Sequence, residues 1–330
     1  MPDILLLSQR DLQQLVTLDH ALIERVAAAF ATLASGKVVM PPVLSMEIAA
    51  HHGEVDVKTA YVPGWDSFAI KISPGFFNNP KIGLPATAGL MTLFCAQTGQ
   101  LKALLLDNGY LTDMRTAAAG AVAAQYLARP EASHVCIIGA GMQAELQLRA
   151  VCLVRPITQA TLWARDLTQA QVLARRMQNA LGISVIATPD LAHAVSAADI
   201  IVTTTPATQP LVQADWLQPG QHITAMGSDQ PHKSELAPAC LARANRYVPD
   251  RQSQTARMGE LRAAIAAGLI ASDHVFAELG DIVAQTAPGR ADCDEITVAD
   301  LTGTGVQDTA IATLAHQRAQ TAGIGTIFTS

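Results

Sequence analysis

The sequence predicts an α/β protein built around a Rossmann-type dinucleotide-binding domain. Residues 135–145, "VCIIGAGMQAE", pass from a short apolar run through Gly139-Ala140-Gly141 into a helix-prone stretch. Beyond Pro130, short apolar runs alternate with segments whose apolar residues recur at helical spacing. Such alternation is typical of a parallel sheet with helices on both faces.

The segment before Pro130 mixes helix and strand patterns. Apolar spacing predicts a helix over 19–33, and the Ala-rich stretch 110–128 predicts a second helix that Arg129-Pro130 ends. Between them lie four strand-like runs, and a Thr-Gly pair between the last two indicates a hairpin at residues 98–99. These predicted strands cover 55–61, 67–72, 89–95 and 101–106. Pro130 is therefore the best candidate for a domain boundary.

After Pro130 the pattern continues as strand and helix in turn. Strands are expected over 134–138, 159–163, 184–187, 199–203 and 222–226. Helices are expected over 142–153, 167–181 and 191–197. At 330 residues the chain is long enough for two domains.

Composition and charge exclude several classes of protein. The formal net charge of −6 gives no electrostatic reason to bind nucleic acid, and no apolar run approaches the length of a membrane span. The N-terminus lacks the basic start and long apolar core of a signal peptide. The five cysteines form no CxxC pair, so we expect reduced thiols in a cytoplasmic protein. His51-His52 lacks a third ligand at metal-binding spacing, so no metal is expected.

Gly139 to Ala144 fit the dinucleotide-binding pattern G-x-G-x-x-[G/A]. Gly139 permits the tight turn, and Gly141 lets the backbone approach a pyrophosphate at the following helix N-terminus. Ala144 allows close packing of helix on strand. With Met142 and Gln143, these glycines form the predicted site for NAD or NADP. The motif alone is weak, but its place between a clear strand and a clear helix strengthens it.

The end of the second strand of this domain bears on the choice between the two cofactors. A carboxylate there binds the ribose hydroxyls of NAD, whereas an Arg accepts the 2′-phosphate of NADP. The sequence has both, Arg165 followed by Asp166, after Ala164. The choice stays open, with Arg165 slightly favouring NADP.

Three further motifs accompany the cofactor turn. Residues 83–129 read "GLPATAGLMTLFCAQTGQLKALLLDNGYLTDMRTAAAGAVAAQYLAR", 226–236 read "MGSDQPHKSEL" and 299–308 read "ADLTGTGVQD". In this order they resemble the ornithine cyclodeaminase/μ-crystallin family, whose pattern has Gly-Leu-Pro, a Thr-Gly hairpin and Leu-Thr-x-x-Arg-Thr-Ala-Ala. The resemblance spans nearly the whole chain, and its details are most similar to the members associated with ectoine utilisation.

The resemblance implies a two-domain fold with the active site in the cleft between the domains. Residues 1–129 with 304–330 would form an α+β substrate-binding and dimerisation domain, and 130–303 the Rossmann domain. Members of the family use NAD or NADP to move hydride to or from the α-carbon of an amino or imino acid. Some are imine reductases or amino-acid dehydrogenases, some are cyclodeaminases, and μ-crystallins also act as binding proteins. A homodimer and a small amino- or imino-acid substrate are therefore expected.

Arg115 and Lys71 are the candidates for binding the substrate carboxylate. A guanidinium has the forked geometry that matches a carboxylate, although a helical Arg115 is also compatible with a surface ion pair to Asp113. Lys71 lies in the stretch FAIKIS, where alternation places it opposite Phe68, Ile70 and the following isoleucine, on what would be an exposed face. The resemblance favours the active-site role for both, with Lys71 also counted as catalytic and Arg115 also counted as cofactor-binding.

Asp229 is the first candidate for proton transfer. It follows a buried strand at the edge where a Rossmann sheet binds its ligand, and desolvation there would favour its protonated form. Capping of the following turn is the alternative role for this Asp. The resemblance assigns catalysis to Asp229 and cofactor binding to Lys233.

Three places depart from the family pattern. Ornithine-using members have Glu where Lys58 falls, and a Lys about 4 Å from an ornithine ammonium would cost roughly 4 kcal/mol at an effective dielectric of about 20. An uncharged or acidic substrate side chain is therefore favoured, with Lys58 as a further substrate-binding residue. Leu301 stands in place of the family serine, so a hydroxyl contact to the nicotinamide would come from Thr302 or Thr304. Thr87, one place beyond the family threonine, is a further cofactor candidate.

These residues support three hypotheses. The first is an NAD(P)-dependent enzyme that reduces an α-imino acid or oxidises the matching α-amino acid. The second is a cyclodeaminase with tightly bound NAD, which Lys58 disfavours. The third is a μ-crystallin-like nicotinamide-dependent binding protein, which would not need Asp229 as an acid.

Overall fold

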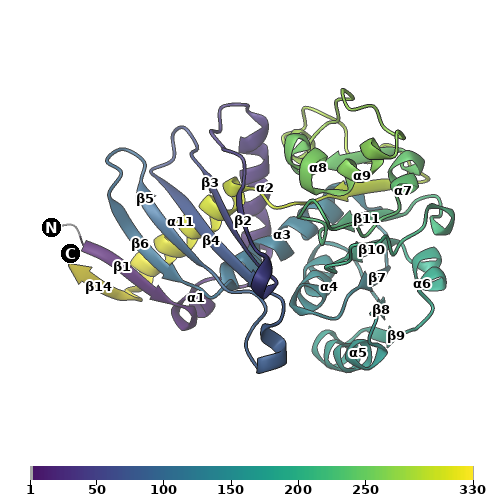
Figure 1. Ribbon diagram of the computed structural model, residues 1–330, viewed down its shortest axis with the longest axis horizontal. Coiled ribbons are helices and arrows are strands. Elements are labelled where there is room, and N and C mark those ends of the chain that lie inside the picture. Colours follow the sequence, from purple (N-terminus) through teal and green to yellow (C-terminus); the bar gives the residue numbers. More distant parts are fainter. Residues whose placement is uncertain (1–2, 330) are drawn as a thin grey trace. The chain divides into compact units, whose positions relative to one another are not determined.

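The computed structural model describes residues 3–329 and divides into two compact units (Figure 1). Met1–Arg115 and Thr304–Ser330 make up the first unit, and Thr116–Gly303 the second. The helix α3 (Tyr110–Leu127) contains residues of both, so the division falls inside a helix, whereas the sequence favours a boundary at Pro130. The second half of α3 packs on the second unit, where a Cβ at Gly120 would lie only 2.0 Å from Gln147 Oε1.

The first unit is built on a seven-stranded mixed sheet with the order β14-β1-β6-β5-β4-β3-β2. All neighbours are antiparallel except β1 and β6, which are parallel. The four predicted strands correspond to β3, β4, β5 and β6, and the predicted hairpin joins the last two. The strands are β1 (Asp3–Ser8), β2 (Leu44–Ile48), β3 (Gly53–Ala60), β4 (Ser67–Phe76), β5 (Leu90–Cys95), β6 (Leu101–Leu106) and β14 (Thr326–Thr329).

Helices cover one face of this sheet. α11 (Gly305–Ala322) crosses β3, β4 and β5, and α2 (His20–Ala34), the predicted helix over 19–33, packs against α11 (Figure 1). The remaining short helices are α1 (Gln9–Leu15) and the 3₁₀ turns η1 (Ala49–His51) and η2 (Asn79–Ile82). Because α11 packs on the sheet and on α2, its residues are buried on more than one side of the helix.

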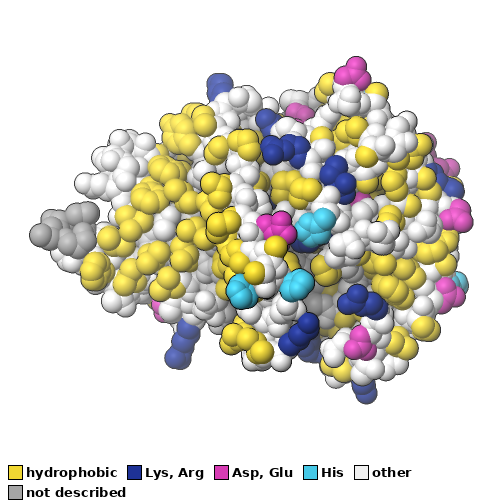
Figure 2. Space-filling view, in the orientation of Figure 1, with side chains coloured by type: hydrophobic (Ala, Val, Ile, Leu, Met, Phe, Trp, Pro, Cys, Tyr) yellow, Lys and Arg dark blue, Asp and Glu magenta, His cyan; other side chains and the backbone are white. Residues whose placement is uncertain are grey.

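The other face of the sheet carries exposed apolar side chains. Figure 2 shows hydrophobic side chains gathered over the strands of the first unit. Those exposed on this face include Leu44, Met46, Ile72, Leu106 and Phe328. The strand register places them on the side opposite to Lys71 and the covering helices.

The second unit is a parallel seven-stranded sheet with the order β12-β13-β11-β10-β7-β8-β9. The strand order runs outward in both directions from β7 and β10, as in the doubly wound Rossmann arrangement. The predicted strands match five of the seven. The strands are β7 (His134–Ile138), β8 (Gln159–Trp163), β9 (Ser184–Ala187), β10 (Ile200–Thr203), β11 (His222–Ala225), β12 (Arg246–Pro249) and β13 (Thr297–Asp300).

Helices cover both faces of this sheet, as the sequence predicts. Val135 and Ile137 face one hydrophobic core, and Cys136 and Ile138 face the other. The three predicted helices are α4 (Met142–Val154), α5 (Leu167–Leu181) and α6 (Leu191–Ala197). The others are α7 (Pro238–Arg243), α8 (Gln252–Met258), α9 (Glu260–Ala266), α10 (Leu279–Val283) and the 3₁₀ turn η3 (Ala214–Trp216).

Two further findings concern the described residues as a group. None of their helices is both long enough and apolar enough to cross a membrane. All five cysteines are free thiols.

Candidate active site

A cluster of buried charges lies on the helix-covered face of the first unit's sheet. Lys71 on β4 is 2% exposed, while Ile70 and Ile72 on either side of it point to the opposite, more open face. Alternation therefore predicts the orientation of Lys71 correctly, but the exposed location is wrong because α11 covers this face. Arg115 on α3 is also buried, so the interpretation as a surface side chain is wrong as well.

Asp308, in the first turn of α11, joins the two cations. Its Oδ2 lies 3.2 Å from Lys71 Nζ, and its Oδ1 accepts a hydrogen bond of 3.1 Å from Arg115 Nε. A second guanidinium nitrogen, NH1, donates to Gln307 Oε1 at 3.3 Å. Gln307 and Asp308 were not among the predicted site residues, although both belong to the quoted motif ADLTGTGVQD.

Lys58 belongs to the same cluster. It lies on β3 directly opposite Lys71 in the antiparallel register and is likewise buried. Burial, together with Arg115 and Lys58, lowers the pKa of Lys71 to about 7, and Asp308 opposes that shift. An ammonium in this setting gains stability from any further anion, which is the chemistry expected of a carboxylate-binding site.

Besides Asp308 Oδ2, whose contact with Lys71 Nζ is an ion pair, two buried polar atoms near the start of α11 have no hydrogen-bond partner. Gln307 Nε2 is one; because Arg115 can only donate, the amide oxygen of Gln307 must face it and the nitrogen points elsewhere. Thr304 Oγ1 is the other. Buried donors without partners are costly, so both atoms are suited to bind a ligand.

The second unit carries the dinucleotide turn. Gly139 has φ +134°, and a Cβ there would lie 2.3 Å from Thr204 Oγ1, so the turn after β7 requires glycine. Gly141 is the N-cap of α4, and a Cβ there would meet nothing within 4 Å. Met142 and Gln143 follow in the first turn of α4, and Ala144 is fully buried against the core. These residues fit a pyrophosphate: the helix N-terminus is open beside Gly141, and no side chain fills that space.

At the end of β8, the carboxylate that is the candidate for binding the ribose hydroxyls of NAD also caps a helix. Asp166 is the N-cap of α5, and its Oδ1 accepts hydrogen bonds from the backbone N–H groups of Thr168 and Gln169 at 2.9 and 3.4 Å. Arg165 beside it is exposed. One carboxylate oxygen of Asp166 therefore caps the N-terminus of α5.

Asp229 lies in the loop after β11. Its carboxylate accepts a hydrogen bond of 2.7 Å from Lys233 Nζ, and its side chain is 39% exposed. The side chain is therefore only partly withdrawn from solvent, and the desolvation that its place after a buried strand predicts stays a prediction. The carboxylate is accessible to a substrate from this position.

Buried Glu235 holds the loop that carries Asp229. Glu235 Oε2 accepts from Gly227 N at 2.8 Å and from Thr203 Oγ1 at 2.6 Å, while Oε1 accepts from Thr205 N and Oγ1. Burial raises the pKa of Glu235, and these donors act against that rise. Sequence reasoning did not single out Glu235, because a lone Glu in a loop carries no signal of burial.

The remaining predicted cofactor residues have different surroundings. The Thr302 hydroxyl is buried and donates to Asp250 Oδ1 at 3.0 Å, so Asp250 already binds this group. Leu301, in place of the family serine, is buried. Thr87 is exposed, and its backbone bridges to Gly75.

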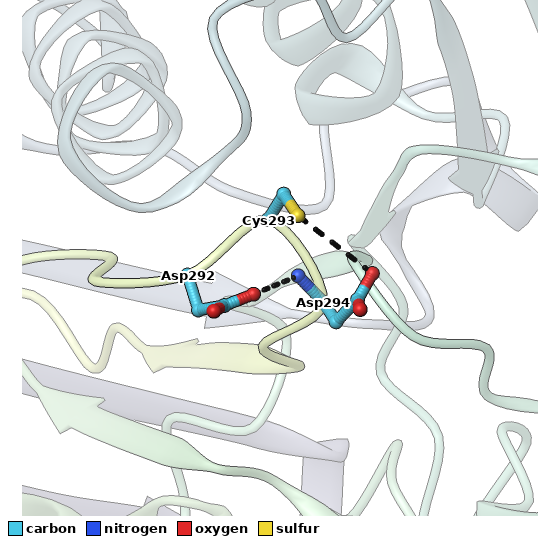
Figure 3. Close-up of side chains that lie close together, drawn as sticks. All are labelled: Asp292, Cys293 and Asp294. Atoms are coloured by element: carbon cyan, nitrogen blue, oxygen red, sulfur yellow. Dashed lines mark hydrogen bonds between the residues drawn. The ribbon is translucent and has the colours of Figure 1, made fainter.

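One group among the described residues has the composition of a metal site. Asp292, Cys293 and Asp294 bring their ligand atoms within 4.8 Å of one another (Figure 3). They are consecutive, exposed residues of one loop, and Asp292 accepts a hydrogen bond from the backbone N–H of Asp294. The local turn accounts for their proximity.

The sequence model of the ornithine cyclodeaminase/mu-crystallin family matches residues 3–323. The chain belongs to this family. Among curated relatives, a putative dehydrogenase of Rhizobium meliloti (strain 1021) is 57% identical over 98% of each chain. An uncharacterized cyclodeaminase of Sinorhizobium fredii (strain NBRC 101917 / NGR234) is 56% identical over the full length of both.

Solved structures of the same family share the fold. The Δ(1)-pyrroline-2-carboxylate reductase of Thermococcus litoralis, in complex with NADH and L-proline, has a TM-score of 0.93 at 33% identity and covers 98% of this chain and 99% of its own. An archaeal alanine dehydrogenase dimer with bound NAD has a TM-score of 0.92 at 32% identity, covering 99% of each chain. The iminosuccinate reductase of Paracoccus denitrificans, in complex with NAD⁺, has a TM-score of 0.91 at 32% identity over the whole of both chains.

Proposed function

We propose that this chain is an NAD(P)-dependent oxidoreductase that reduces an α-imino acid or oxidises the matching α-amino acid. The buried cluster of Lys71 and Arg115, joined by Asp308, carries this proposal. Two buried cations on one carboxylate retain a net positive charge that an α-carboxylate of a substrate would neutralise. The glycine turn after β7 supplies the place for a nicotinamide dinucleotide.

Each step of the reaction has a residue suited to it. Arg115 and Lys71 hold the α-carboxylate, and the unpartnered Nε2 of Gln307 is a further donor beside them. A bound nicotinamide supplies or accepts the hydride at the α-carbon. Protonated Asp229 gives its proton to the substrate nitrogen during reduction, and the ionised carboxylate, which Lys233 holds in place, takes a proton from that nitrogen during oxidation.

Lys58 restricts the substrate side chain. A buried lysine on the strand next to Lys71 repels an ammonium and attracts an anionic or neutral group. The substrate is therefore an α-imino or α-amino acid without a cationic side chain. This disfavours a cyclodeaminase acting on ornithine.

Coenzyme choice follows from the end of β8. Asp166 caps α5 with one carboxylate oxygen, whereas Arg165 is exposed at the same strand end. An exposed guanidinium there suits a 2′-phosphate. We therefore propose that the protein prefers NADPH to NADH, a choice that the assay below tests with either reduced cofactor.

The exposed apolar face of the first unit's sheet is the proposed dimer interface. A contiguous apolar surface on an uncovered sheet is a typical site of self-association. An archaeal alanine dehydrogenase of the same fold has been solved as a dimer. We place the homodimer in the cytoplasm, where the five free thiols stay reduced.

An assay of nicotinamide absorbance tests the function. The purified protein is mixed with cyclic and open-chain α-imino acids and either reduced cofactor, and ornithine is tested with NAD⁺ while ammonia is measured. Oxidation of reduced cofactor that matches the imine consumed supports the proposal. Ammonia and proline from ornithine without net change in cofactor would instead make the protein a cyclodeaminase, as the name of its Sinorhizobium relative indicates.

A third outcome is a nicotinamide-dependent binding protein. In that case no imine is consumed, a ligand still binds in the presence of cofactor, and Asp229→Asn leaves the binding constant unchanged. The two enzyme hypotheses require that variant to lose turnover.

A further inference from the structure

We propose that Asp308 is a positioning residue that locks Lys71 and Arg115 into a single clamp for the substrate carboxylate. The inference rests on the proposed function, because it assigns a role within that site. Asp308 is fully buried; its Oδ2 forms an ion pair with Lys71 Nζ at 3.2 Å, and its Oδ1 accepts a hydrogen bond from Arg115 Nε at 3.1 Å. Its carboxylate is thus committed to the protein's own cations, so Asp308 acts through them.

The helix that bears Asp308 is fixed to the sheet beside it. Thr309 Oγ1 donates to Ala60 O on β3 at 2.9 Å and accepts from Ala69 N on β4 at 3.1 Å. At Gly305 the helix comes so close to β3 that a Cβ would lie 2.3 Å from Thr59 O. These contacts hold the backbone around Asp308 at a set distance from β4, which carries Lys71.

The Asp308 contact also orients the guanidinium of Arg115. Nε is directed to Asp308, and NH1 donates once to Gln307, so the remaining N–H groups stay available to a second acceptor. A guanidinium presents its donors in a rigid fork, so fixing one edge fixes the other. The free edge of the Arg115 guanidinium can then bind a carboxylate without a change in its side-chain rotamer.

Asp308 also sets the charge of Lys71. The charged groups facing Lys71 are Arg115 from α3, Lys58 from β3, Asp308 from α11 and Asp107 from the segment between β6 and α3. Burial, Arg115 and Lys58 lower the pKa of Lys71 to about 7, and Asp308 is the neighbour that acts most strongly against this. A lysine must be protonated to hold a carboxylate, so without Asp308 the clamp would lose one cation near neutral pH.

Two variants separate the effect of the Asp308 charge from the effect of the position of its carboxylate. Asp308→Asn removes the charge and keeps the shape, while Asp308→Glu keeps the charge and displaces it. Thr313→Val, a change at another buried polar residue of α11, is the matched control. For each protein we would measure KM and kcat for an α-imino acid from pH 5.5 to 8.5 (a range spanning about 1.5 units on each side of the Lys71 pKa), and the dissociation constant of the reduced nicotinamide.

For Asp308→Asn we expect KM at neutral pH to rise by about tenfold or more, as for loss of one charge-assisted hydrogen bond. The rise of KM with pH, which follows deprotonation of Lys71, should start at a lower pH than in the wild type. Asp308→Glu should raise KM without moving the pH at which the rise begins. The nicotinamide dissociation constant should not change in either variant, and Thr313→Val should match the wild type. A KM profile of Asp308→Asn that matches the wild type at every pH would overturn the proposal, as would an equal loss of cofactor binding.

A readout without turnover distinguishes failure of the Asp308 role from failure of the proposed function. The carbon-13 resonance of the Lys71 side chain, assigned by comparison with Lys71→Met, reports its titration directly. Asp308→Asn should lower that titration midpoint, and Asp308→Glu should preserve it; an unchanged midpoint in Asp308→Asn contradicts the role of Asp308. If the wild type consumed no imino acid while the Lys71 titration midpoint still fell in Asp308→Asn, the proposed function would fail, and only the effect of Asp308 on the charge of Lys71 would stand. If Asp308→Asn did not fold, Asp308→Glu would decide the matter by its KM and midpoint.

Discussion

Asp229 is positioned by charged side chains of its own loop. Asp229 is held by Lys233, four residues away, and its loop is held by Glu235, whose carboxylate binds groups at the ends of β10 and β11. Replacing Asp229 by Asn keeps the size of the side chain and removes the acid.

We expect Asp229→Asn to lower kcat by about 10²–10⁴-fold, the usual contribution of a general acid. The dissociation constant of the nicotinamide should stay the same, because the glycine turn does not involve Asp229. Steady-state kinetics and cofactor fluorescence measure the two quantities. A kcat within about twofold of the wild type would mean that another group supplies the proton.

The sequence does not predict the burial of a strand residue when a helix from a distant part of the chain covers it. Alternation correctly predicts that Lys71 lies opposite Ile70 and Ile72, but it does not say which face is covered. That is decided by α11, which lies more than two hundred residues further along the chain and places Asp308 beside Lys71. For the same reason Gln307 and Asp308 carry no signal of their own: a polar pair in a first helical turn is usually exposed.

At the scale of elements, the two glycines of the cofactor turn have separable functions. Gly139 is needed by the fold, since φ is +134° and a Cβ would lie 2.3 Å from Thr204 Oγ1. Gly141 has open space at the same position, so only a bound dinucleotide would collide with a side chain there.

We therefore expect Gly139→Ala to lower the free energy of unfolding by about 1–3 kcal/mol through backbone strain. Gly141→Val should melt close to the wild-type temperature yet lose nicotinamide binding by about tenfold or more. Thermal melts and fluorescence titrations of both variants give the comparison. Normal cofactor affinity in folded Gly141→Val would show that the dinucleotide does not approach this turn.

The variant Arg165→Ser tests whether the end of β8 selects between NADPH and NADH. We expect the ratio of kcat/KM for NADPH over NADH to fall by about tenfold or more, since a charge-assisted contact to a 2′-phosphate is lost. Arg175→Ser, an exposed arginine further along α5, is the control and should leave the ratio unchanged. An unaltered ratio in Arg165→Ser would remove Arg165 from coenzyme selection.

Elements with strong periodicity are predictable, and short or edge elements are not. The strands and helices from β7 to β11 follow the alternation read from the sequence, because each strand is apolar on both sides and each helix has one apolar face. β2 is exposed at four of its five residues and β14 at all four, so neither has the alternation of a strand with one buried face. β14 becomes a strand only by pairing with β1 at the other end of the chain, a contact that no local pattern encodes.

At the scale of the whole molecule, the exposed apolar face of the first unit's sheet predicts where two copies of the chain form a homodimer. Leu106→Glu places a charge in the middle of this face, on β6. We expect this variant to sediment as a monomer where the wild type sediments as a dimer, because burying an unpaired carboxylate costs several kcal/mol. Val172→Glu, at an exposed apolar position of the second unit, is the control and should remain dimeric. Light scattering after gel filtration measures both; a dimeric Leu106→Glu would exclude this face as the interface.

The most direct test of the central claim follows a labelled hydride. Reduced nicotinamide carrying deuterium at both positions of C4 is incubated with the protein and an α-imino acid, and the amino-acid product is analysed by mass spectrometry. Direct transfer predicts one deuterium on the α-carbon for each cofactor oxidised, with its yield reduced in Asp229→Asn. Release of ammonia with no net oxidation of cofactor, or product without the label, would contradict the assignment as an imino-acid reductase.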